Sequence, residues 1–394
     1  MSKGPVVRRR SLGLVTEGER KTMEFTVSKT DLVRELNLSQ GVVEKKTTIP
    51  ILSNVLVEAI GDRINLTATD LELGIRSSCP ARVKKPGAGT IPAKRLLDYV
   101  RLLPDADLDV KLQENQWASL VCGRSKTRIA GMSRESFPEL PQMPDVLAQI
   151  PVGLLASMIS KTIFAISMEE SRFTLNGSLL LLKNNSLGMV ATDGHRLAMV
   201  ENNVDLPGVT TPFRALLPRK AMGEILKLAQ DASAEATIQF SGDENHLFFQ
   251  LGDRLLLSRK LTGNFPDFER VLPKDHPHSV ALDREELRKS IERVAQFSDE
   301  RSRAVRMRVQ EGELHIHSSL SETGESEESL PVEYDGSPVE IGFNAGYMLD
   351  FLRATTEPQV AFHFKDAHSA GELRPSGDGA ANYKYRYVVM PMRI

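Results

Sequence analysis

The sequence contains one pattern three times, at a constant spacing of 126 residues. Each copy carries an acidic residue, a basic residue three positions later, and apolar residues at fixed places around them. A period of this length corresponds to a whole small domain rather than to one unit of a solenoid. The repeat therefore predicts three copies of one domain. The paired acidic and basic residues are Asp98 and Arg101, Glu224 and Lys227, and Asp350 and Arg353.

The repeats account for almost the whole chain. From Met23 onward there are 372 residues, which is three lengths of 124. Each length is enough to bury a core of its own. We expect domains at residues 23–145, 146–272 and 273–394. Residues 1–22 stand apart, because their three consecutive arginines precede an apolar run too short for a secretory signal, and we expect a disordered extension or an upstream start codon.

The repeated segment has the pattern of an amphipathic helix. In the first copy, apolar residues within 96–103 form one stripe, and Lys94, Asp98 and Arg101 form the opposite one. In the second copy, we expect Pro218 at the first helical position, where a missing N–H is tolerated. A further helix opens each repeat. These opening helices are expected at about 29–43, 151–167 and 283–298.

The rest of each repeat alternates apolar and polar residues with the period of a strand. Leu71, Leu73 and Ile75, for example, are predicted to share one face of a strand. Two helices and about eight short strands per repeat predict an α+β fold of three structurally similar domains.

Charge is unevenly distributed, although the net charge is only −2. Basic residues gather on the repeated helices, whereas residues 322–335 of the third repeat are strongly acidic. One basic helix is usually only a solvated face. Basic faces at equivalent places in successive domains can add up to one positive field. Such a field favours binding of a phosphate backbone without reading of the bases.

No strong catalytic or metal-binding motif is present. The run Asp193–Arg196 contains an acid–base pair, but no nucleophile motif or glycine-rich phosphate loop accompanies it. Two pairs of histidines lack cysteines or carboxylates at zinc spacing. The two cysteines are too few for a disulfide framework and suit a reducing cytoplasm. We therefore expect no enzyme activity, no cofactor and no metal. The histidine pairs are His315 with His317 and His276 with His278.

Five longer runs of residues are specific to one known family. They lie at Thr48–Asn54, Leu66–Glu72, Val190–Ala198, Gly263–Phe268 and Tyr387–Ile394. Through these runs the chain resembles the beta subunit of bacterial DNA polymerase III, the family of DNA sliding clamps. The resemblance extends over all three repeats.

The resemblance implies the DNA-clamp fold and a head-to-tail homodimer that closes into a ring of six domains around duplex DNA. A ring of this kind is a processivity factor: it slides without sequence specificity and tethers the replicative polymerase through a peptide-binding pocket. The implied partners are the DNA polymerase III alpha subunit, the delta subunit of the clamp loader, and other polymerases and repair factors. The implied location is the cytoplasm, in association with the nucleoid and not with a membrane.

The resemblance also implies which residues face DNA. They are basic residues on or near the repeated helices, and one aromatic residue in the second repeat. They are Lys46, Lys94, Arg95, Phe173, Arg219 and Lys220.

The implied peptide pocket lies in the second and third repeats and is an apolar cleft with a few polar groups, suited to a Leu or Phe side chain. His368 stands where the family usually has an apolar pocket residue. The pocket residues are Arg172, Leu175, Thr192, Gly194, His195, Arg196, Leu197, Pro266, Arg270, Val271, Asn344, Tyr347, Val388, Val389, Met390, Pro391, Met392, Arg393 and Ile394.

The implied dimer joint brings a basic edge of the first repeat against an acidic edge of the third, with Ile129 and Phe297 as its apolar centre. Thr127 stands where an aromatic residue is common. The charged residues of the joint are Arg124, Lys126 and Arg128 on one side, and Glu322, Glu325, Glu327 and Glu328 on the other.

Two other functions compete with this interpretation. A sequence-specific DNA-binding regulator built from repeats would need a helix that presents Arg, Asn or Gln to base edges. The repeated helices carry alternating basic and acidic residues instead. A pure protein-interaction scaffold would leave the repeated basic faces unexplained.

Overall fold

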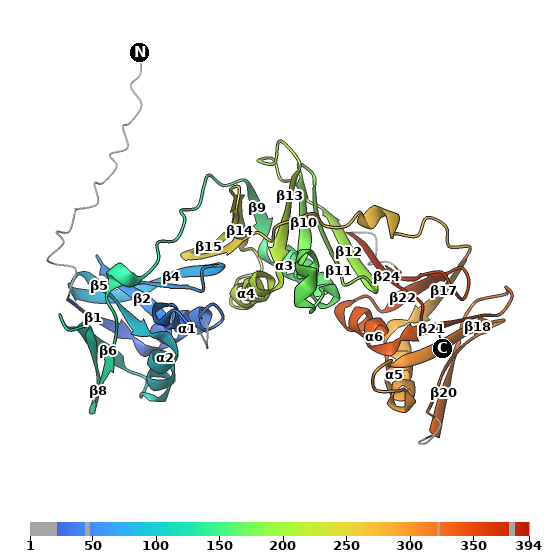
Figure 1. Cartoon of the computed structure of the whole chain (residues 1–394), viewed down its shortest axis with the longest axis horizontal. Coiled ribbons are helices and arrows are strands. Elements are labelled where there is room, and N and C mark those ends of the chain that lie inside the picture. Colours follow the sequence, from blue (N-terminus) through green and yellow to red (C-terminus); the bar gives the residue numbers. More distant parts are fainter. Residues whose placement is uncertain (1–21, 44–47, 321–323, 378–382, 394) are drawn as a thin grey trace, which may run out of the picture. The chain divides into compact units, whose positions relative to one another are not determined.

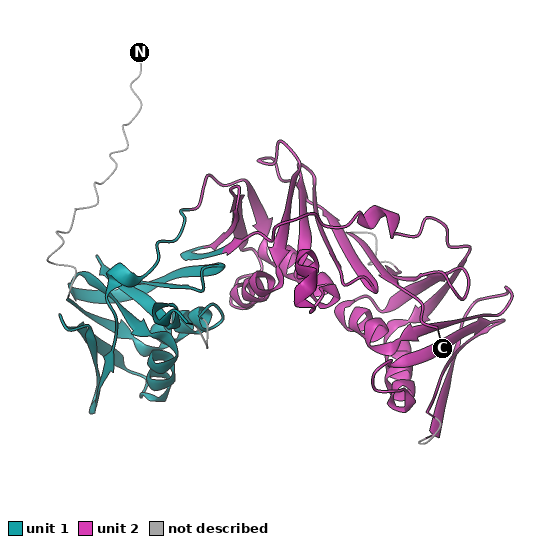
Figure 2. Cartoon of the chain, in the orientation of Figure 1, with its two compact units in different colours: residues 1–142, 252–257 teal, residues 143–251, 258–394 magenta. Residues whose placement is uncertain are grey.

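The computed structural model describes residues 22–43, 48–320, 324–377 and 383–393. These residues divide into two compact units, which Figure 2 colours separately. Unit 1 contains the described residues up to Gln142 together with Gly252–Leu257, and unit 2 contains Met143–Leu251 and Ser258–Ile394. The predicted extension up to residue 21 and three predicted site residues lie outside the described residues. The three site residues are Lys46, Glu322 and Ile394.

Unit 1 is one copy of the predicted α+β repeat. Its α-helices α1 and α2 lie next to each other on one face of the strands (Figure 1). The long strand β4 pairs with β3 through its first half and with β1 through its second half, so it joins two halves of the sheet. The elements are α1 (Lys29–Gln40), α2 (Ala93–Leu102), β1 (Met23–Ser28), β2 (Asn54–Ile60), β3 (Arg63–Thr69), β4 (Leu73–Lys85), β5 (Gly87–Pro92), β6 (Asp107–Leu112), β7 (Trp117–Cys122) and β8 (Ser125–Ala130).

Unit 2 contains the second and third copies of the repeat. One sheet runs in the order β13-β10-β11-β12-β24-β23-β22-β17, and a second runs in the order β20-β19-β18-β21. The α-helices are α3 (Val152–Thr162), α4 (Arg219–Gln230), α5 (Arg284–Val294) and α6 (Ala345–Ala354).

The strands of these two repeats are short, as predicted, and β16 has residues in both units. They are β9 (Ala148–Pro151), β10 (Gly177–Lys183), β11 (Ser186–Thr192), β12 (Arg196–Asn203), β13 (Phe213–Pro218), β14 (Thr237–Gly242), β15 (His246–Leu251), β16 (Arg254–Arg259), β17 (His278–Asp283), β18 (Ala304–Gln310), β19 (Glu313–Leu320), β20 (Gly324–Pro331), β21 (Val339–Asn344), β22 (Gln359–Phe364), β23 (Gly371–Ser376) and β24 (Tyr383–Val389).

The amphipathic pattern of the repeated helices is confirmed. In α2, the side chains of Leu96 and Leu97 are buried in the core of unit 1, whereas Lys94 and Arg101 are exposed. Burial of one such leucine stabilises the fold by about 1.5–3 kcal/mol. The helix is therefore held by its packing on the sheet, and its basic face is left in solvent.

The opening helices are also confirmed, with shorter α-helical parts than predicted. α3 ends at Thr162 and α5 ends at Val294, and each continues into a short 3-10 helix, at Ile163–Ala165 and Ala295–Phe297. The tightening of the last turn satisfies backbone groups that an α-helix end leaves without partners.

Two local predictions were wrong. Pro218 has an extended backbone, with ψ of 145°, so it precedes the first residue of α4 rather than being that residue. Leu71 is not part of a strand: it has φ of 78°, its exposed fraction is 48%, and β4 begins at Leu73. Asp70 accepts hydrogen bonds from the backbone N–H groups of Glu72 and Leu73, which forms a tight turn here.

Candidate functional site

Two segments almost 200 residues apart in the sequence form one strand pair in unit 2. β12 and β24 are antiparallel neighbours, with Leu197 opposite Val388 and Arg196 opposite Val389. Beyond the strands, the N–H of Met390 donates to the carbonyl of His195, over 2.9 Å. The structure therefore brings the predicted loop and the predicted tail of the pocket together, on a sheet shared by the second and third repeats (Figure 1).

The loop before β12 is a tight turn with defined hydrogen bonds. The Thr192 hydroxyl donates to the carbonyl of Arg196 over 2.6 Å, and Asp193 accepts from the N–H groups of His195 and Arg196. Gly194 has φ of 89°, in the left-handed region where a side chain would be strained, and an added Cβ would lie 3.1 Å from the guanidinium of Arg172. The turn geometry thus explains the glycine.

Arg196 joins four segments of unit 2. Its guanidinium donates to Asp193 at 3.1 Å, to Asp350 on α6 at 2.5 Å and to the carbonyl of Phe164 at 2.5 Å. The guanidinium carbon lies 4.3 Å from the centroid of the Tyr347 ring. Burial alone would lower the pKa of Arg196, but the interactions of its guanidinium with Tyr387 and Asp350 outweigh burial and raise that pKa. Arg196 is therefore a fixed cation at the base of the site.

An apolar cluster lies beside this turn. Leu197 and Val388 are buried in it, together with Leu179 of β10 and Phe268 of the connection between β16 and β17. Val271 is partly buried against the same cluster. A cavity of about 410 Å³ lies next to the cluster, with Pro266 and Phe268 among its lining residues. Apolar side chains thus form the floor of this region, next to the turn that holds Arg196. The cavity itself is lined by residues outside the loop 192–197 and β24.

The remaining predicted pocket residues fall into two classes. Asn344 and Val389 are structural: Asn344 caps α6 by accepting from the N–H of Tyr347, and Val389 is buried in β24. The others remain accessible at the rim. They are Arg172, Leu175, His195, Pro266, Arg270, Met390, Pro391, Met392 and Arg393.

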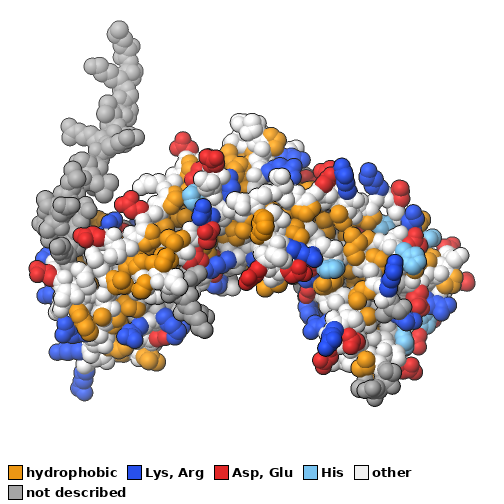
Figure 3. All heavy atoms as spheres, viewed as in Figure 1, with side chains coloured by type: hydrophobic (Ala, Val, Ile, Leu, Met, Phe, Trp, Pro, Cys, Tyr) orange, Lys and Arg blue, Asp and Glu red, His pale blue; other side chains and the backbone are white. Residues whose placement is uncertain are grey.

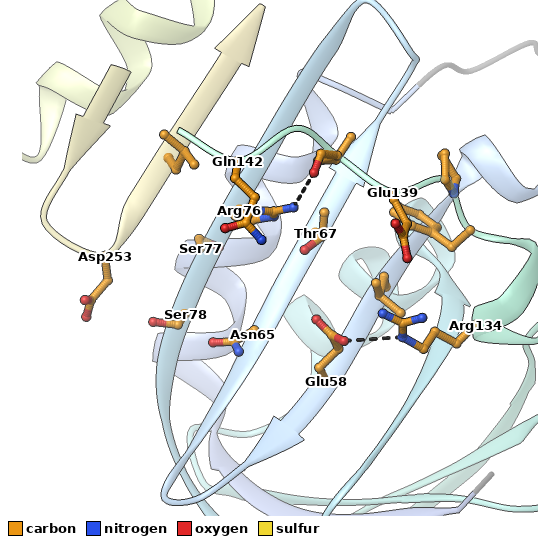
Figure 4. A pocket seen from close by; sticks show the side chains of 15 residues that line it. Glu58, Asn65, Thr67, Arg76, Ser77, Ser78, Arg134, Glu139, Gln142 and Asp253 are labelled. Carbon is orange, nitrogen blue, oxygen red and sulfur yellow. Dashed lines mark hydrogen bonds and ion pairs between the residues drawn. The ribbon is translucent and has the colours of Figure 1, made fainter. Parts of the chain in front are cut away.

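The first repeat has a cavity under the corresponding connection, but its lining is polar. This cavity has a volume of about 520 Å³, and its floor is the outer face of β2, β3 and β4 (Figure 4). Thr67 and Arg76 face each other there across the strand pair, where the second repeat has Val190 and Met199. Glu58 forms an ion pair with Arg134 at 3.5 Å. The chain therefore has an apolar cluster in its second repeat and a mainly polar cavity at the corresponding place in its first.

The predicted DNA-facing residues lie on α2, α4 and the 3-10 helix Glu170–Leu175. Lys94, Arg95 and Lys220 are exposed, and Lys94 forms an ion pair with Asp98 at 2.7 Å. Arg219 donates to the carbonyl of Ile163 over 2.9 Å, so part of its hydrogen-bonding capacity closes the end of α3. The exposed fraction of Phe173 is 58%.

The predicted joint residues lie on end strands of two sheets. β8 is the end strand of unit 1 and carries the exposed side chains of Lys126 and Arg128, with Arg124 just before it. Ile129 was predicted at the apolar centre of a joint, but its exposed fraction is 3% and it is packed into the core of unit 1. It points to the helix side of the sheet, which the alternation of one strand could not reveal.

β20 is the end strand on the acidic side and divides its glutamates between two faces. Glu328 points toward α5 and forms an ion pair with Arg293 at 2.6 Å, whereas Glu325 and Glu327 lie on the opposite face. The half-buried ring of Phe297 lies beside the first residue of β20, 3.4 Å from a Cβ added at Gly324.

Sequence reasoning missed several residues that contact the predicted loop and tail of the pocket or pack in the same cluster. Leu179 and Phe268 are in the apolar cluster, and Met199 is packed against it. The alternation of β10 and β12 shows that these side chains share a face, but not that the face lies under the tail. Asp350 was noted only as a repeated acid, yet it binds Arg196 from 154 positions away in the sequence.

Two kinds of feature are absent from the described residues. No three His, Cys, Asp or Glu side chains are grouped there as a metal ion would require. No α-helix in that part of the chain has the length and apolar composition needed to cross a membrane.

Comparison with known proteins identifies the family. Three models of the DNA polymerase III beta subunit match in succession: the N-terminal domain at residues 23–141, the central domain at 149–267 and the C-terminal domain at 269–393. The beta sliding clamp of Pseudomonas putida is 35% identical over 378 residues, which cover 94% of this chain and 100% of the relative. That of Caulobacter vibrioides is 36% identical over 386 residues, with the same coverage.

Solved structures agree with this result. The crystal structure of a DnaN sliding clamp from Pseudomonas aeruginosa, bound to griselimycin, has a TM-score of 0.88 and 34% identity and covers 94% of this chain and 100% of its own. The sliding clamp of Bacillus subtilis has a TM-score of 0.89 and 26% identity, with 94% and 99% coverage. The chain belongs to the DNA polymerase III beta subunit family of sliding clamps, whose function is that of a processivity factor in DNA replication.

Proposed function

We propose that two copies of this chain close into a ring around duplex DNA and tether replication proteins through a peptide-binding cleft beside the paired strands β12 and β24. The observation that carries this proposal is the pairing of β12 with β24: two segments far apart in the sequence contribute to one apolar cluster across the second and third repeats. A peptide with a Leu or Phe side chain would bury apolar area on that floor. The DNA polymerase III alpha subunit, the clamp loader delta subunit and other polymerases and repair factors are the proposed partners.

The proposed contact with DNA uses the basic helix faces and Phe173. Lys94, Arg95 and Lys220 project from helices whose other faces are buried, so their positions are fixed while their charges stay hydrated. Lys46 belongs to the same proposed set. Contacts of this kind neutralise phosphates at any sequence, which allows sliding. The exposed stripe of α2 places Asp98 between Lys94 and Arg101, and this mixture of charges favours backbone contact over base reading.

The proposed joint pairs β8 of one copy with β20 of the other. Lys126 and Arg128 lie on the face of β8 away from the helices, and Glu325 and Glu327 lie on the corresponding face of β20. A continuous sheet across the joint would therefore place opposite charges side by side. Phe297 supplies apolar area next to this edge, and Glu322 and Arg124 belong to the same proposed contact.

We further propose that the three domains extend over 23–145, 146–272 and 273–394, and that the chain acts without catalysing a reaction. A role in replication favours the cytoplasm, in association with the nucleoid.

The ring can be tested by its topology. The protein is loaded onto nicked circular DNA with ATP and a bacterial clamp loader, and half of the sample is then linearised. We expect the protein to remain on circles and to leave linear DNA by sliding off its ends. Equal retention on circular and linear DNA would contradict encirclement, since ordinary charge-driven binding does not depend on DNA ends.

A further inference from the structure

The outer face of the sheet β20-β19-β18-β21 carries rows of charge. His315 and His317 on β19 point to one face, and β20 on one side supplies glutamates to them. β18 on the other side supplies arginines. Figure 3 shows histidine and acidic side chains next to one another where Figure 1 draws β18 and β20. These side chains line a shallow cavity of about 260 Å³; its residues are Arg306, Arg308, Gln310, His315, His317, Glu327 and Glu340.

His315 is placed between two carboxylates. Its Nδ1 lies 3.0 Å from Glu327 on β20, and its Nε2 lies 2.7 Å from Glu313 on its own strand. A carboxylate can only accept a hydrogen bond, and a neutral imidazole has only one N–H to donate. Both contacts can therefore be hydrogen bonds only when the ring is protonated. The amide of Gln310, 3.1 Å from Nε2, can offer its oxygen to a charged ring and its nitrogen to a neutral one.

His317 has a weaker contact of the same kind. Its Nε2 lies 3.9 Å from Glu325, whose side chain has an exposed fraction of 78%. His317 is also directly opposite Glu327 in the strand register. Both histidines are thus neighbours of the two glutamates on the outer face of the end strand, and both can exchange protons with solvent.

We infer that His315 and His317 are a proton-dependent control of the contact between β20 and the basic strand β8 of a second copy of this chain. The inference rests on the proposed joint. Glu325 and Glu327 have the histidines on one side, and in the proposed dimer they have Lys126 and Arg128 on the other. Each carboxylate is therefore shared between a histidine of its own sheet and a fixed cation of the partner.

The direction of the effect follows from the charges around the pair. With neutral histidines, the outer face of β20 is acidic and attracts the basic strand. Imidazole becomes protonated between about pH 5 and 8. Protonation neutralises part of the negative charge of the glutamates on β20 and places new cations near the basic side chains of the partner's β8. Both changes weaken the joint as pH falls. The charged groups that surround His315 and His317 on this face are Glu313 on β19, Arg306 and Arg308 on β18, Glu325 and Glu327 on β20, and Glu340 on β21.

The test is the dimer dissociation constant of the full chain, measured by analytical ultracentrifugation at about pH 8 and about pH 6 at fixed ionic strength. We expect the constant to rise about tenfold at the lower pH, as for a few exposed ion pairs. His315→Gln with His317→Gln should abolish most of this rise. His368→Gln is the matched control, because this exposed histidine lies in the loop between β22 and β23 rather than on β19, and its replacement should leave the rise unchanged.

A second variant keeps the test independent of the histidine substitutions. Glu325→Gln with Glu327→Gln should weaken the dimer at pH 8 to about the level of the wild type at pH 6, and should remove most of the pH dependence. A dimer that is stable at pH 8 and equally stable at pH 6 would overturn the inference and leave the ring intact. A pH dependence that persists in the double histidine variant would overturn it too. A wild type that is monomeric at pH 8 would overturn the proposed joint as well.

Discussion

Replacement of Arg196 by methionine should destabilise unit 2 far more than its position in a surface turn suggests. The exposed fraction of the Arg196 side chain is 10%, and its guanidinium binds two carboxylates, those of Asp193 and Asp350. Methionine keeps much of the volume but leaves these two acids near each other without a cation. Removal of one partner from a buried ion pair typically costs about 3–5 kcal/mol. We expect Arg196→Met to lower the free energy of unfolding of unit 2 by an amount in that range.

The matched control is Arg353→Met, also in unit 2. Arg353 forms an ion pair with Glu292 at 2.8 Å, but its side-chain exposed fraction is 56%. An exposed pair contributes only about 0–1 kcal/mol. The double variant Arg196→Met with Asp350→Asn should recover part of the loss, because it removes one of the unpaired carboxylates.

The aromatic residues of the chain allow the two units to be followed separately. Trp117, the single tryptophan, lies on β7 in unit 1, whereas five of the six tyrosines lie in unit 2; the sixth, Tyr99, lies on α2 in unit 1. Urea unfolding of Arg196→Met should therefore shift the tyrosine near-ultraviolet dichroism to lower urea and leave the tryptophan fluorescence transition in place. If the tyrosine transition of Arg196→Met moved no further than that of Arg353→Met, the guanidinium would not hold this part of unit 2 together.

Three further outcomes are expected. Deletion of residues 390–394 should abolish binding of a Leu- and Phe-containing peptide in a fluorescence-anisotropy titration, because about 2 kcal/mol or more of binding free energy is lost. Dimer formation should be retained. An unchanged peptide affinity would show that the tail is not part of the proposed cleft. Reversal of charge at Arg124, Lys126 and Arg128 should raise the dimer dissociation constant, at a free-energy cost of about 1 kcal/mol or less for each ion pair lost. The constant is measured by sedimentation at low salt, and an unchanged value would contradict the proposed joint. Burial alone would raise the pKa of Glu372, but hydrogen bonds from two arginines lower that pKa from 4.5 to about 2. The ionised carboxylate therefore contributes about 3 kcal/mol of stability above pH 4.5, and this contribution is lost as pH falls toward 2. Glu372→Gln should have a flatter acid unfolding profile than the wild type, and a parallel profile would count against this assignment.

The sequence predicts the helices well because apolar residues recur about every 3.6 positions, and these residues form the face that is buried. Leu96 and Leu97 could be assigned to the core from spacing alone, and the structure confirms both. Leu71 could not be assigned, because alternation continues across a turn whose geometry is set by hydrogen bonds to Asp70. Ile129 shows a related limit. Alternation places the side chains of Arg128 and Ile129 on opposite faces of β8, but the face that is buried depends on where the helices pack on the sheet.

Contacts distant in sequence were the least predictable part. The repeated acid occurs in three different environments: Asp98 pairs with Lys94 in solvent, Glu224 is buried and pairs with Lys227, and Asp350 binds Arg196. Identical spacing gave no sign of this difference, because each environment depends on which strand or loop packs over the helix.

The pairing of β12 with β24 sets an order of events during synthesis. The first residue of β24 follows that of β12 by 187 positions, from 196 to 383. At ordinary translation rates of about 5–20 residues per second, roughly 10–40 s pass between the two. Throughout that interval β12 presents an open row of backbone donors and acceptors, and Arg196 lacks its carboxylate on α6. The nascent second repeat is thus exposed to strand addition by other chains until the third has been made, and slow translation of residues 204–382 would prolong that exposure.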